Sequence, residues 1–365
     1  MTIIKDTQTN KPAIGRSQIA LLEKLSNASG VSGDEGEVRA IILEEIKSHV
    51  DETKIDALGN LLVLRKARMD NPLRVMLAAH MDEVGLMIVA GDDGGIFEFE
   101  RVGSVDIRQL VGKQVLVGKN HIPGVIGARP IHLLEEEDMK KTIPIDNLRI
   151  DLGLNSSDKA KPGDRVVFGT RFSQVGPSLF GKALDNRMGV TTLIELVKHA
   201  PANIEMLAVF TVQEEIGGRG ARVSAYGYNP DLAIVLDTTP ANDLPTWDDT
   251  ENAHYNTVLG KGPAIYIADK GTIYDRRLIN FFAEIGISNK IPYQIRQPGG
   301  GGTDAGQIHR QRSGIPSVAI SVPHRNTHSA ISIARLADWK NTLGLVYNGL
   351  LKLEPALLKH TDSQY

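Results

Sequence analysis

The hydrophobic positions of the chain form several apolar runs that end in histidine or acidic residues. The clearest run covers residues 204–212, is rich in β-branched side chains, and is followed by Glu214, Glu215 and two glycines. A continuous apolar run closed by glycine predicts a buried strand that leads into a tight loop. Another run repeats the pattern and ends at His80 and Asp82. Ligands bind at the carboxyl ends of the strands in α/β proteins, so these four residues are candidate site residues.

Two further apolar runs end in the same way. One stops at Asp237, and the other, residues 317–322, leads into a segment that contains His324 and His328. A fifth candidate, Asp185, opens a predicted helix. Because the strand ends of an open parallel sheet meet on one edge, we expect these side chains to converge.

Segments with helical spacing alternate with apolar runs over most of the chain. The alternation predicts a three-layer α/β/α domain with a largely parallel sheet. The predicted helices cover residues 17–29, 35–46, 185–199, 275–285 and 330–353, with a short helix after residue 220.

The pattern changes between residues 84 and 176, where short β runs are separated by glycine and helical spacing is almost absent. Such a block predicts an inserted β-rich domain, either a small barrel or a sandwich, with a lid on the main core as the alternative. We therefore expect a discontinuous main domain, residues 1–83 and 177–365, and an inserted separate or lid domain, residues 84–176. The expected strands cover residues 84–90, 96–101, 114–117, 125–128 and 165–168.

Composition limits the kind of partner and of metal site. The 365 residues include 41 basic and 44 acidic side chains, a balance that does not suggest a nucleic-acid partner. The chain has no cysteine, so any metal must be held by histidine and carboxylates. Residues 1–16 are polar and no run reaches the ~18 apolar residues of a membrane span. We expect a soluble, cytoplasmic protein without a membrane partner.

The residues at the strand ends favour a metal centre. Two histidines and three carboxylates fit a pair of divalent ions that share one carboxylate. In a regular strand Glu214 and Glu215 would point to opposite faces, and burial of a lone carboxylate is costly. The pair is easier to explain if both side chains reach one cationic centre. The simpler interpretation is that both are solvated loop acids.

Taken together, six short motifs resemble the M42 family of dinuclear metallo-aminopeptidases, which includes glutamyl aminopeptidases and the tetrahedral TET peptidases. The motifs occur in the family's order and each is weak alone. They are Ala79-His80-Met81-Asp82-Glu83-Val84-Gly85, Lys182-Ala183-Leu184-Asp185-Asn186-Arg187, Glu214-Glu215-Ile216-Gly217 with Gly220-Ala221, Asp237-Thr238-Thr239-Pro240-Ala241, Gly301-Gly302-Thr303-Asp304-Ala305, and Arg325-Asn326-Thr327-His328-Ser329.

The resemblance implies two divalent ions in each subunit, either Zn²⁺ or Co²⁺, with Mn²⁺ as a further candidate. Asp185 would bridge both ions. His80 and Asp237 would complete one site, and Glu215 and His328 would complete the other.

The resemblance also implies that Glu214 is the general base and that Asp82 orients the His80 imidazole. The family commonly has an aromatic residue between the arginine and the liganding histidine of the last motif. This chain has Asn326 and Thr327 there. Neither position binds metal, so the departure affects the fit of the substrate more than catalysis.

The activity implied is removal of the N-terminal residue of short peptides by a water that bridges two metal ions. The family also implies a homo-oligomer in which dimers assemble into a dodecamer through contacts of the β-rich insertion. A glycoside hydrolase that uses Glu214 and Glu215 is one alternative, although its two carboxyl groups must flank a sugar about 5–9.5 Å apart. A metal-binding scaffold without activity is another.

Several residues near the motifs keep a second interpretation. His324 is an alternative ligand to His328, and Asp185 alone would be interpreted as a helix cap. Asp304 has no assigned role, because an aspartate in a glycine loop is often only a turn or capping residue. Three histidines outside the motifs are expected to be ordinary surface or packing residues, namely His121, His132 and His309.

Overall fold

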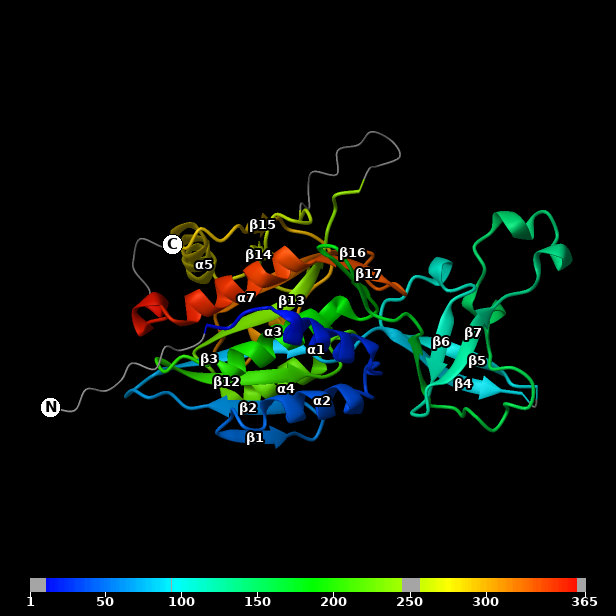
Figure 1. Ribbon diagram of the computed structural model, residues 1–365, viewed down its shortest axis with the longest axis horizontal. Coiled ribbons are helices and arrows are strands. Elements are labelled where there is room, and N and C mark those ends of the chain that lie inside the picture. Colours follow the sequence, from blue (N-terminus) through cyan, green and yellow to red (C-terminus); the bar gives the residue numbers. More distant parts are fainter. Residues whose placement is uncertain (1–10, 93, 245–256, 360–365) are drawn as a thin grey trace.

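The computed structural model describes residues 11–92, 94–244 and 257–359. One large α/β body carries a smaller all-β body on one side (Figure 1). The large body is built on an 11-stranded sheet with the strand order β1-β2-β12-β3-β13-β16-β17-β11-β10, and β14 and β15 branch from β16. Its strands are β1 (Glu52–Ile55), β2 (Leu61–Arg65), β3 (Leu73–His80), β10 (Ser173–Val175), β11 (Ser178–Gly181), β12 (Ile204–Thr211), β13 (Leu232–Pro240), β14 (Ala264–Tyr266), β15 (Gln294–Arg296), β16 (Ser317–Arg325) and β17 (Ser332–Arg335).

The four central strands, β12, β3, β13 and β16, are mutually parallel, and antiparallel strands flank them. In β3, Val75 and Leu77 pack into the core on one face of the sheet, whereas Met76 and Ala78 pack into the core on the other. A strand that is buried on both faces must be apolar throughout, which is why these strands appear as continuous hydrophobic runs. The predicted α/β class with a parallel core is confirmed.

Helices cover both faces of this sheet and make three layers. Apolar residues of α1, α2, α3, α5 and α7 join the larger core, and those of α4 and α6 join the smaller core on the opposite face. Among the described residues, no helix has the length and apolar character needed to cross a bilayer. The helices are α1 (Arg16–Asn27), α2 (Gly36–Ile46), α3 (Leu184–Lys198), α4 (Arg219–Tyr228), α5 (Arg276–Ser288), α6 (Ala305–Ile308) and α7 (Leu336–Leu350).

The smaller body is a closed antiparallel barrel with the strand order β4-β5-β8-β7-β6-β9, and it has its own apolar core. The predicted barrel-like insertion is confirmed as a fold, whereas its boundaries and its role as a dimerisation or lid domain stay predictions. Residues 128–148, between β7 and β8, project from the barrel (Figure 1). The strands are β4 (Gly85–Gly91), β5 (Ile96–Val102), β6 (Gln114–Val117), β7 (Ile122–Gly127), β8 (Arg149–Asp151) and β9 (Arg165–Phe168).

The helix predicted at residues 330–353 is wrong at its start. The structure has strand β17 (Ser332–Arg335) there, and helix α7 begins at Leu336. Burial alternates along β17, and its backbone pairs with β16 on one side and β11 on the other. Hydrogen bonding to two neighbouring strands therefore prevails over the helical spacing of the apolar residues.

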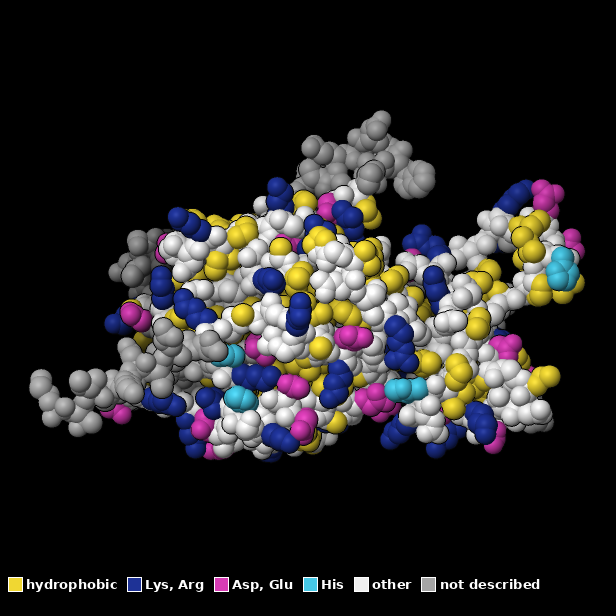
Figure 2. All heavy atoms as spheres, viewed as in Figure 1, with side chains coloured by type: hydrophobic (Ala, Val, Ile, Leu, Met, Phe, Trp, Pro, Cys, Tyr) yellow, Lys and Arg dark blue, Asp and Glu magenta, His cyan; other side chains and the backbone are white. Residues whose placement is uncertain are grey.

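Charged side chains of both signs are interspersed over the face of the molecule shown in Figure 2. Neither sign dominates this face, in keeping with the nearly equal counts of the two signs in the sequence.

Candidate active site

The site lies at the carboxyl ends of the central parallel strands. His80 is the last residue of β3 and is paired in register with Thr211, the last residue of β12. The loop after β12 carries Glu214 and Glu215. Asp237 lies on β13, which pairs with β3. The edge that the apolar runs predicted is therefore the edge where the acids and the histidine meet.

Asp185 lies between two imidazoles. Its Oδ1 is 3.3 Å from His80 Nε2, and its Oδ2 is 3.6 Å from His328 Nε2. A second carboxylate accompanies each imidazole: Asp237 Oδ1 lies 3.4 Å from His80 Nε2, and Glu215 Oε2 lies 3.1 Å from His328 Nε2. The structure thus brings together all five residues expected to bind metal, as two imidazole–carboxylate pairs that share Asp185.

The donors fit divalent cations. Atoms of His80, Asp185 and Glu215 lie within 4.8 Å of one another and could hold one ion. The buried Oδ1 of Asp185 and the buried Oε1 of Glu215 have no hydrogen-bond partner, which is unfavourable for carboxylate oxygens unless a cation compensates them. Imidazole and carboxylate together suit Zn²⁺, Co²⁺ or Mn²⁺.

The carboxyl groups of this cluster titrate differently. Burial raises the pKa of Asp237, and it also raises the pKa of Glu215. Burial acts in the same direction on Asp185, but the nearby imidazoles of His328 and His80 outweigh it and hold the pKa of Asp185 well below its usual range. Asp185 is therefore the most strongly ionised carboxylate of the three, as suits a group placed between two positive centres.

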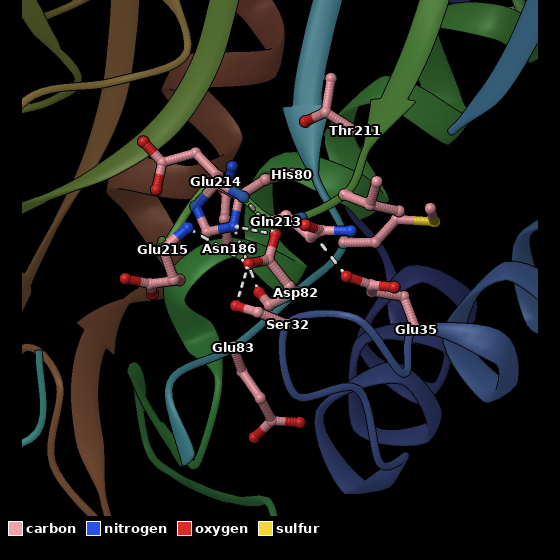
Figure 3. A network of polar contacts seen from close by, with 12 residues as sticks. Ser32, Glu35, His80, Asp82, Glu83, Asn186, Thr211, Gln213, Glu214 and Glu215 are labelled. Atoms are coloured by element: carbon pink, nitrogen blue, oxygen red, sulfur yellow. Dashed lines mark hydrogen bonds and ion pairs between the residues drawn. The ribbon is translucent and has the colours of Figure 1, made fainter. Parts of the chain in front are cut away.

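Glu214 has a different environment from Glu215, and their side chains leave the loop in different directions (Figure 3). Glu214 lines the cavity, and burial raises its pKa well above the usual range, with a contribution from the nearby Asp304 and Asp237. A carboxyl group with a raised pKa accepts a proton more readily than an ordinary glutamate.

Asp82 holds the loop that carries both glutamates. Its carboxylate accepts hydrogen bonds from the backbone N–H groups of Glu214 (3.0 Å) and Glu215 (3.2 Å) and from the Ser32 hydroxyl (2.6 Å), as Figure 3 shows. His80 Nδ1 lies 3.2 Å from the Asp82 carbonyl oxygen and 3.6 Å from its carboxylate. Asp82 therefore positions the loop through its side chain and contacts the imidazole mainly through its backbone. The family resemblance implies only that Asp82 orients the imidazole, and does not predict that Asp82 holds the loop.

Glycine allows the sharp turn of this loop. Gly217 and Gly218 have positive φ angles of 117° and 62°. Such φ values cost a residue with a Cβ free energy, whereas glycine adopts them readily. A Cβ on Gly220 would lie 2.1 Å from Asn60 Oδ1, so the start of α4 packs directly on the residue that precedes β2.

The family model described as M42 glutamyl aminopeptidase matches residues 59–345. The chain belongs to the M42 peptidase family.

Individual M42 relatives cover nearly the whole chain. A protein of Acetivibrio thermocellus, whose name records an inferred aminopeptidase activity, is 37% identical over 335 residues, covering 90% of this chain and 97% of the relative. The lysyl aminopeptidase of Pyrococcus furiosus is 31% identical, with coverage of 92% and 97%. The glutamyl aminopeptidase of Lactococcus lactis subsp. cremoris is 32% identical, with coverage of 87% and 91%.

Solved M42-like structures have the same architecture. The TET aminopeptidase of Thaumarchaeota archaeon SCGC AB-539-E09 superimposes with a TM-score of 0.88 at 33% identity and covers 93% of this chain and 98% of its own. The TET1 peptidase of Pyrococcus horikoshii, which can assemble into a tetrahedron or a large octahedral shell, has a TM-score of 0.80 at 36% identity, with coverage of 92% and 100%. These relationships support an aminopeptidase activity.

A buried ion cluster anchors the segment around Asp185 in this M42 chain. Glu83 accepts hydrogen bonds from Lys182 Nζ (2.8 Å) and Arg187 Nη2 (3.0 Å), and all three side chains are almost fully buried. Arg187 also donates to the carbonyl oxygens of Leu25 and Met81. The cluster joins the chain just after Asp82 to both sides of Asp185. Glu83, Lys182 and Arg187 belong to the motifs named above, but the motifs do not predict that the three side chains are in contact.

We expect Glu83→Ala to destabilise the M42 fold by about 3–5 kcal/mol, because it leaves two cations buried without a carboxylate. Urea unfolding at a fixed protein concentration measures this effect. The matched control is Glu98→Ala, which removes an exposed ion pair with Arg149 at 2.9 Å and should cost about 0.2–1 kcal/mol. Equal losses in the two variants would contradict the importance of the buried cluster.

A cavity of about 710 Å³ opens beside the cluster of acids and imidazoles. Residues 300–302 of the glycine loop line it, as does Ser104 from the connection between β5 and β6 of the barrel side. Asp304 follows that loop, is buried, and accepts a hydrogen bond from the Thr211 hydroxyl at 2.5 Å. Burial raises the pKa of Asp304 to about 7, and its side chain makes no capping hydrogen bond to α6.

The other histidines named in the sequence analysis lie outside this cluster in the described part of the chain. His324 Nε2 lies 2.8 Å from the Thr327 hydroxyl and 3.4 Å from the Thr238 hydroxyl, and burial lowers its pKa to about 4. His121 pairs with Glu37, His309 contacts the Ala305 carbonyl oxygen, and His132 is exposed. Only His80 and His328 contact the site carboxylates through short ring-nitrogen distances among the described residues.

Proposed function

We propose that this chain is a metal-dependent aminopeptidase that removes the N-terminal residue of short peptides. The observation that carries the proposal is the position of Asp185, whose two oxygens face separate imidazole–carboxylate pairs. Glu214 lines the same cavity and belongs to neither pair. A hydrolytic site needs this combination, in which one set of groups holds cations and another group moves a proton.

Two divalent ions are the proposed cofactors, and Zn²⁺, Co²⁺ and Mn²⁺ suit the donors. His80 and Asp237 would hold one ion, Glu215 and His328 would hold the other, and Asp185 would contact both. When bound, such a pair polarises a carbonyl group and lowers the pKa of a water molecule between the ions from 15.7 to about 7.

Side chains of the protein would then transfer the proton and position the reacting groups. Glu214 would take the proton from the attacking water and return it to the leaving amine, a role that its raised pKa favours. Asp82 would keep Glu214 in place through the backbone of the loop. A free substrate α-amino group could bind among the site carboxylates, and this would account for cleavage at the N-terminus.

The proposed biological setting follows the relatives. We propose a homo-oligomer of dimers that assembles into a dodecamer, because the TET1 peptidase of Pyrococcus horikoshii can form a tetrahedron. The inserted domain, residues 84–176, would provide dimerisation or lid contacts, and the protein would act in the cytoplasm. One relative is a lysyl and another a glutamyl aminopeptidase, so the relatives do not determine which first residue this chain prefers.

Metal removal and restoration test the proposal. After treatment with a chelator, hydrolysis of a panel of aminoacyl reporters is expected to fall to background, and single additions of Zn²⁺, Co²⁺ or Mn²⁺ should restore it to different extents. Bound metal, measured on the same samples, should approach two ions per subunit. Full peptidase activity in the chelated protein would contradict the proposal. Glycosidase activity that survives chelation would favour the glycoside hydrolase alternative, and absence of turnover with metal bound would favour a scaffold.

A further inference from the structure

The cavity is lined by charges of both signs. The acids and imidazoles of the proposed metal centre line it, and so do three cationic side chains, Lys270, Arg296 and Arg310. None of these three cations has a carboxylate within 4.0 Å among the residues that the structure describes. The cations therefore do not serve as partners of the proposed metal ligands.

Arg296 is a buried cation, only 6% exposed, whose hydrogen bonds go to neutral oxygens. Its guanidinium donates to the Thr239 hydroxyl at 3.1 Å and to the Gly300 carbonyl oxygen at 3.0 Å, and it lies 4.3 Å from the centre of the Tyr266 ring. These contacts fix the guanidinium but leave its net charge in place. A buried cation without a counter-charge favours binding of an anion nearby.

Lys270 and Arg310 are exposed and lie on neighbouring stretches of backbone. A Cβ on Gly271 would lie 3.6 Å from Gly306 Cα, so the segment after Lys270 packs against the start of α6. Arg310 Nε donates to the Gly306 carbonyl oxygen at 2.8 Å, which places Arg310 at the same contact. The Lys270 backbone N–H donates to the Gly301 carbonyl oxygen at 3.0 Å, and this hydrogen bond connects the segment that contains Lys270 to the glycine loop.

The acidic residues closest in sequence to Lys270 and Arg310 accept hydrogen bonds from other groups. Asp269 accepts hydrogen bonds from the Tyr274 hydroxyl at 2.5 Å and from the Gly271 N–H at 2.7 Å. Asp304 accepts from Thr211. Lys270 and Arg310 line the cavity, and neither of these two carboxylates makes an ion pair with them.

We propose that Lys270 and Arg310, together with the buried Arg296, bind a carboxylate of the peptide substrate. The proposal rests on the proposed aminopeptidase function, because the carboxylate must belong to a peptide whose first bond lies at the metal centre. Two parts of a peptide provide this chemistry: the side chain of an acidic first residue, and the free C-terminus of a very short peptide. Arginine suits either, since its guanidinium can pair with both carboxylate oxygens.

Two pairs of substrates distinguish these sources in the metal-loaded protein. The first pair is a glutamyl and a glutaminyl reporter amide, which differ only in the charge of the first side chain. The second pair is Leu-Gly-Gly and its C-terminal amide, which differ only at the C-terminus. We expect kcat/KM to favour the carboxylate member of one pair by about 10- to 100-fold, the range for hydrogen bonds to a charged group.

The double variant K270Q/R310Q should reduce that preference to less than about 3-fold, and Lys270→Glu should reverse it towards a lysyl reporter. Lys352→Gln, which removes an exposed lysine on the surface after α7, is the matched control and should leave both ratios unchanged. A collapsed ratio in the first pair assigns the site to the side chain of the first residue, and a collapsed ratio in the second pair assigns it to the C-terminus.

The proposal is overturned if neither pair shows a preference, or if the preference survives in the double variant. These outcomes differ from failure of the proposed function. If the wild-type protein hydrolyses a leucyl reporter without any preference for carboxylates, only the carboxylate site is wrong. If it hydrolyses no aminoacyl substrate with metal bound, the aminopeptidase function itself is wrong.

Discussion

Glu214→Gln is expected to lower kcat by about 10²- to 10⁴-fold and to leave the metal content unchanged. Glutamine has nearly the same shape as glutamate but cannot accept the proton of the attacking water. Glu214 makes no ion pair with His80 or His328 among the described contacts, so the rest of the site should keep its arrangement. Steady-state kinetics and elemental analysis of the same preparation measure the two effects.

Glu215→Gln is the matched control because it makes the same chemical change one residue away. Glu215 Oε2 lies 3.1 Å from His328 Nε2, so this variant should lose metal as well as activity. If Glu214→Gln kept wild-type turnover, or if it emptied the site of metal, Glu214 would not be the general base.

Asp185→Ala is expected to remove bound metal and to lower activity by more than the ~10- to 100-fold typical of residues that only support metal ligands. Asp185 contacts both imidazoles, so its loss affects both proposed ion sites at once. Metal content, activity and the free energy of unfolding should be measured together on purified protein.

The control for a general loss of stability is Asp275→Ala. Asp275 caps α5 and pairs with Arg277 at 2.7 Å, and it is not one of the proposed metal ligands. Its removal should cost about 1 kcal/mol and leave both metals bound. If Asp185→Ala retained two ions per subunit, the shared-carboxylate arrangement would have to be abandoned.

The parts of the fold that could be predicted from sequence are those with long apolar runs. Strands β3, β12, β13 and β16 are buried on both faces, so burial alone makes them hydrophobic throughout. Strands β8, β10 and β17 have only three or four residues with mixed polarity, and pairing with neighbouring strands defines them. Short strands of this kind leave almost no periodic signal.

The site, too, has features that the sequence predicts and features that it does not. The convergence of His80 and Glu215 follows from where β3 and β12 end, and Asp237 lies on β13 beside β3, although that strand continues to Pro240. The separate roles of Glu214 and Glu215 came from the family resemblance. The buried pairing of Glu83 with Lys182 could not be seen, because the two residues are 99 positions apart and lysine is usually solvated. The shared cavity lining of Lys270, Arg296 and Arg310 could not be seen either, because the three residues come from separate segments of the chain.

The free edges of the large sheet are very short. Edge strand β1 has four residues, β10 has three, and β15, at the end of the side branch, also has three. An exposed edge can recruit a strand from another molecule, but such brief and polar edges provide few backbone hydrogen bonds for this. Copies of this protein should therefore associate through side-chain surfaces and not by adding strands edge to edge.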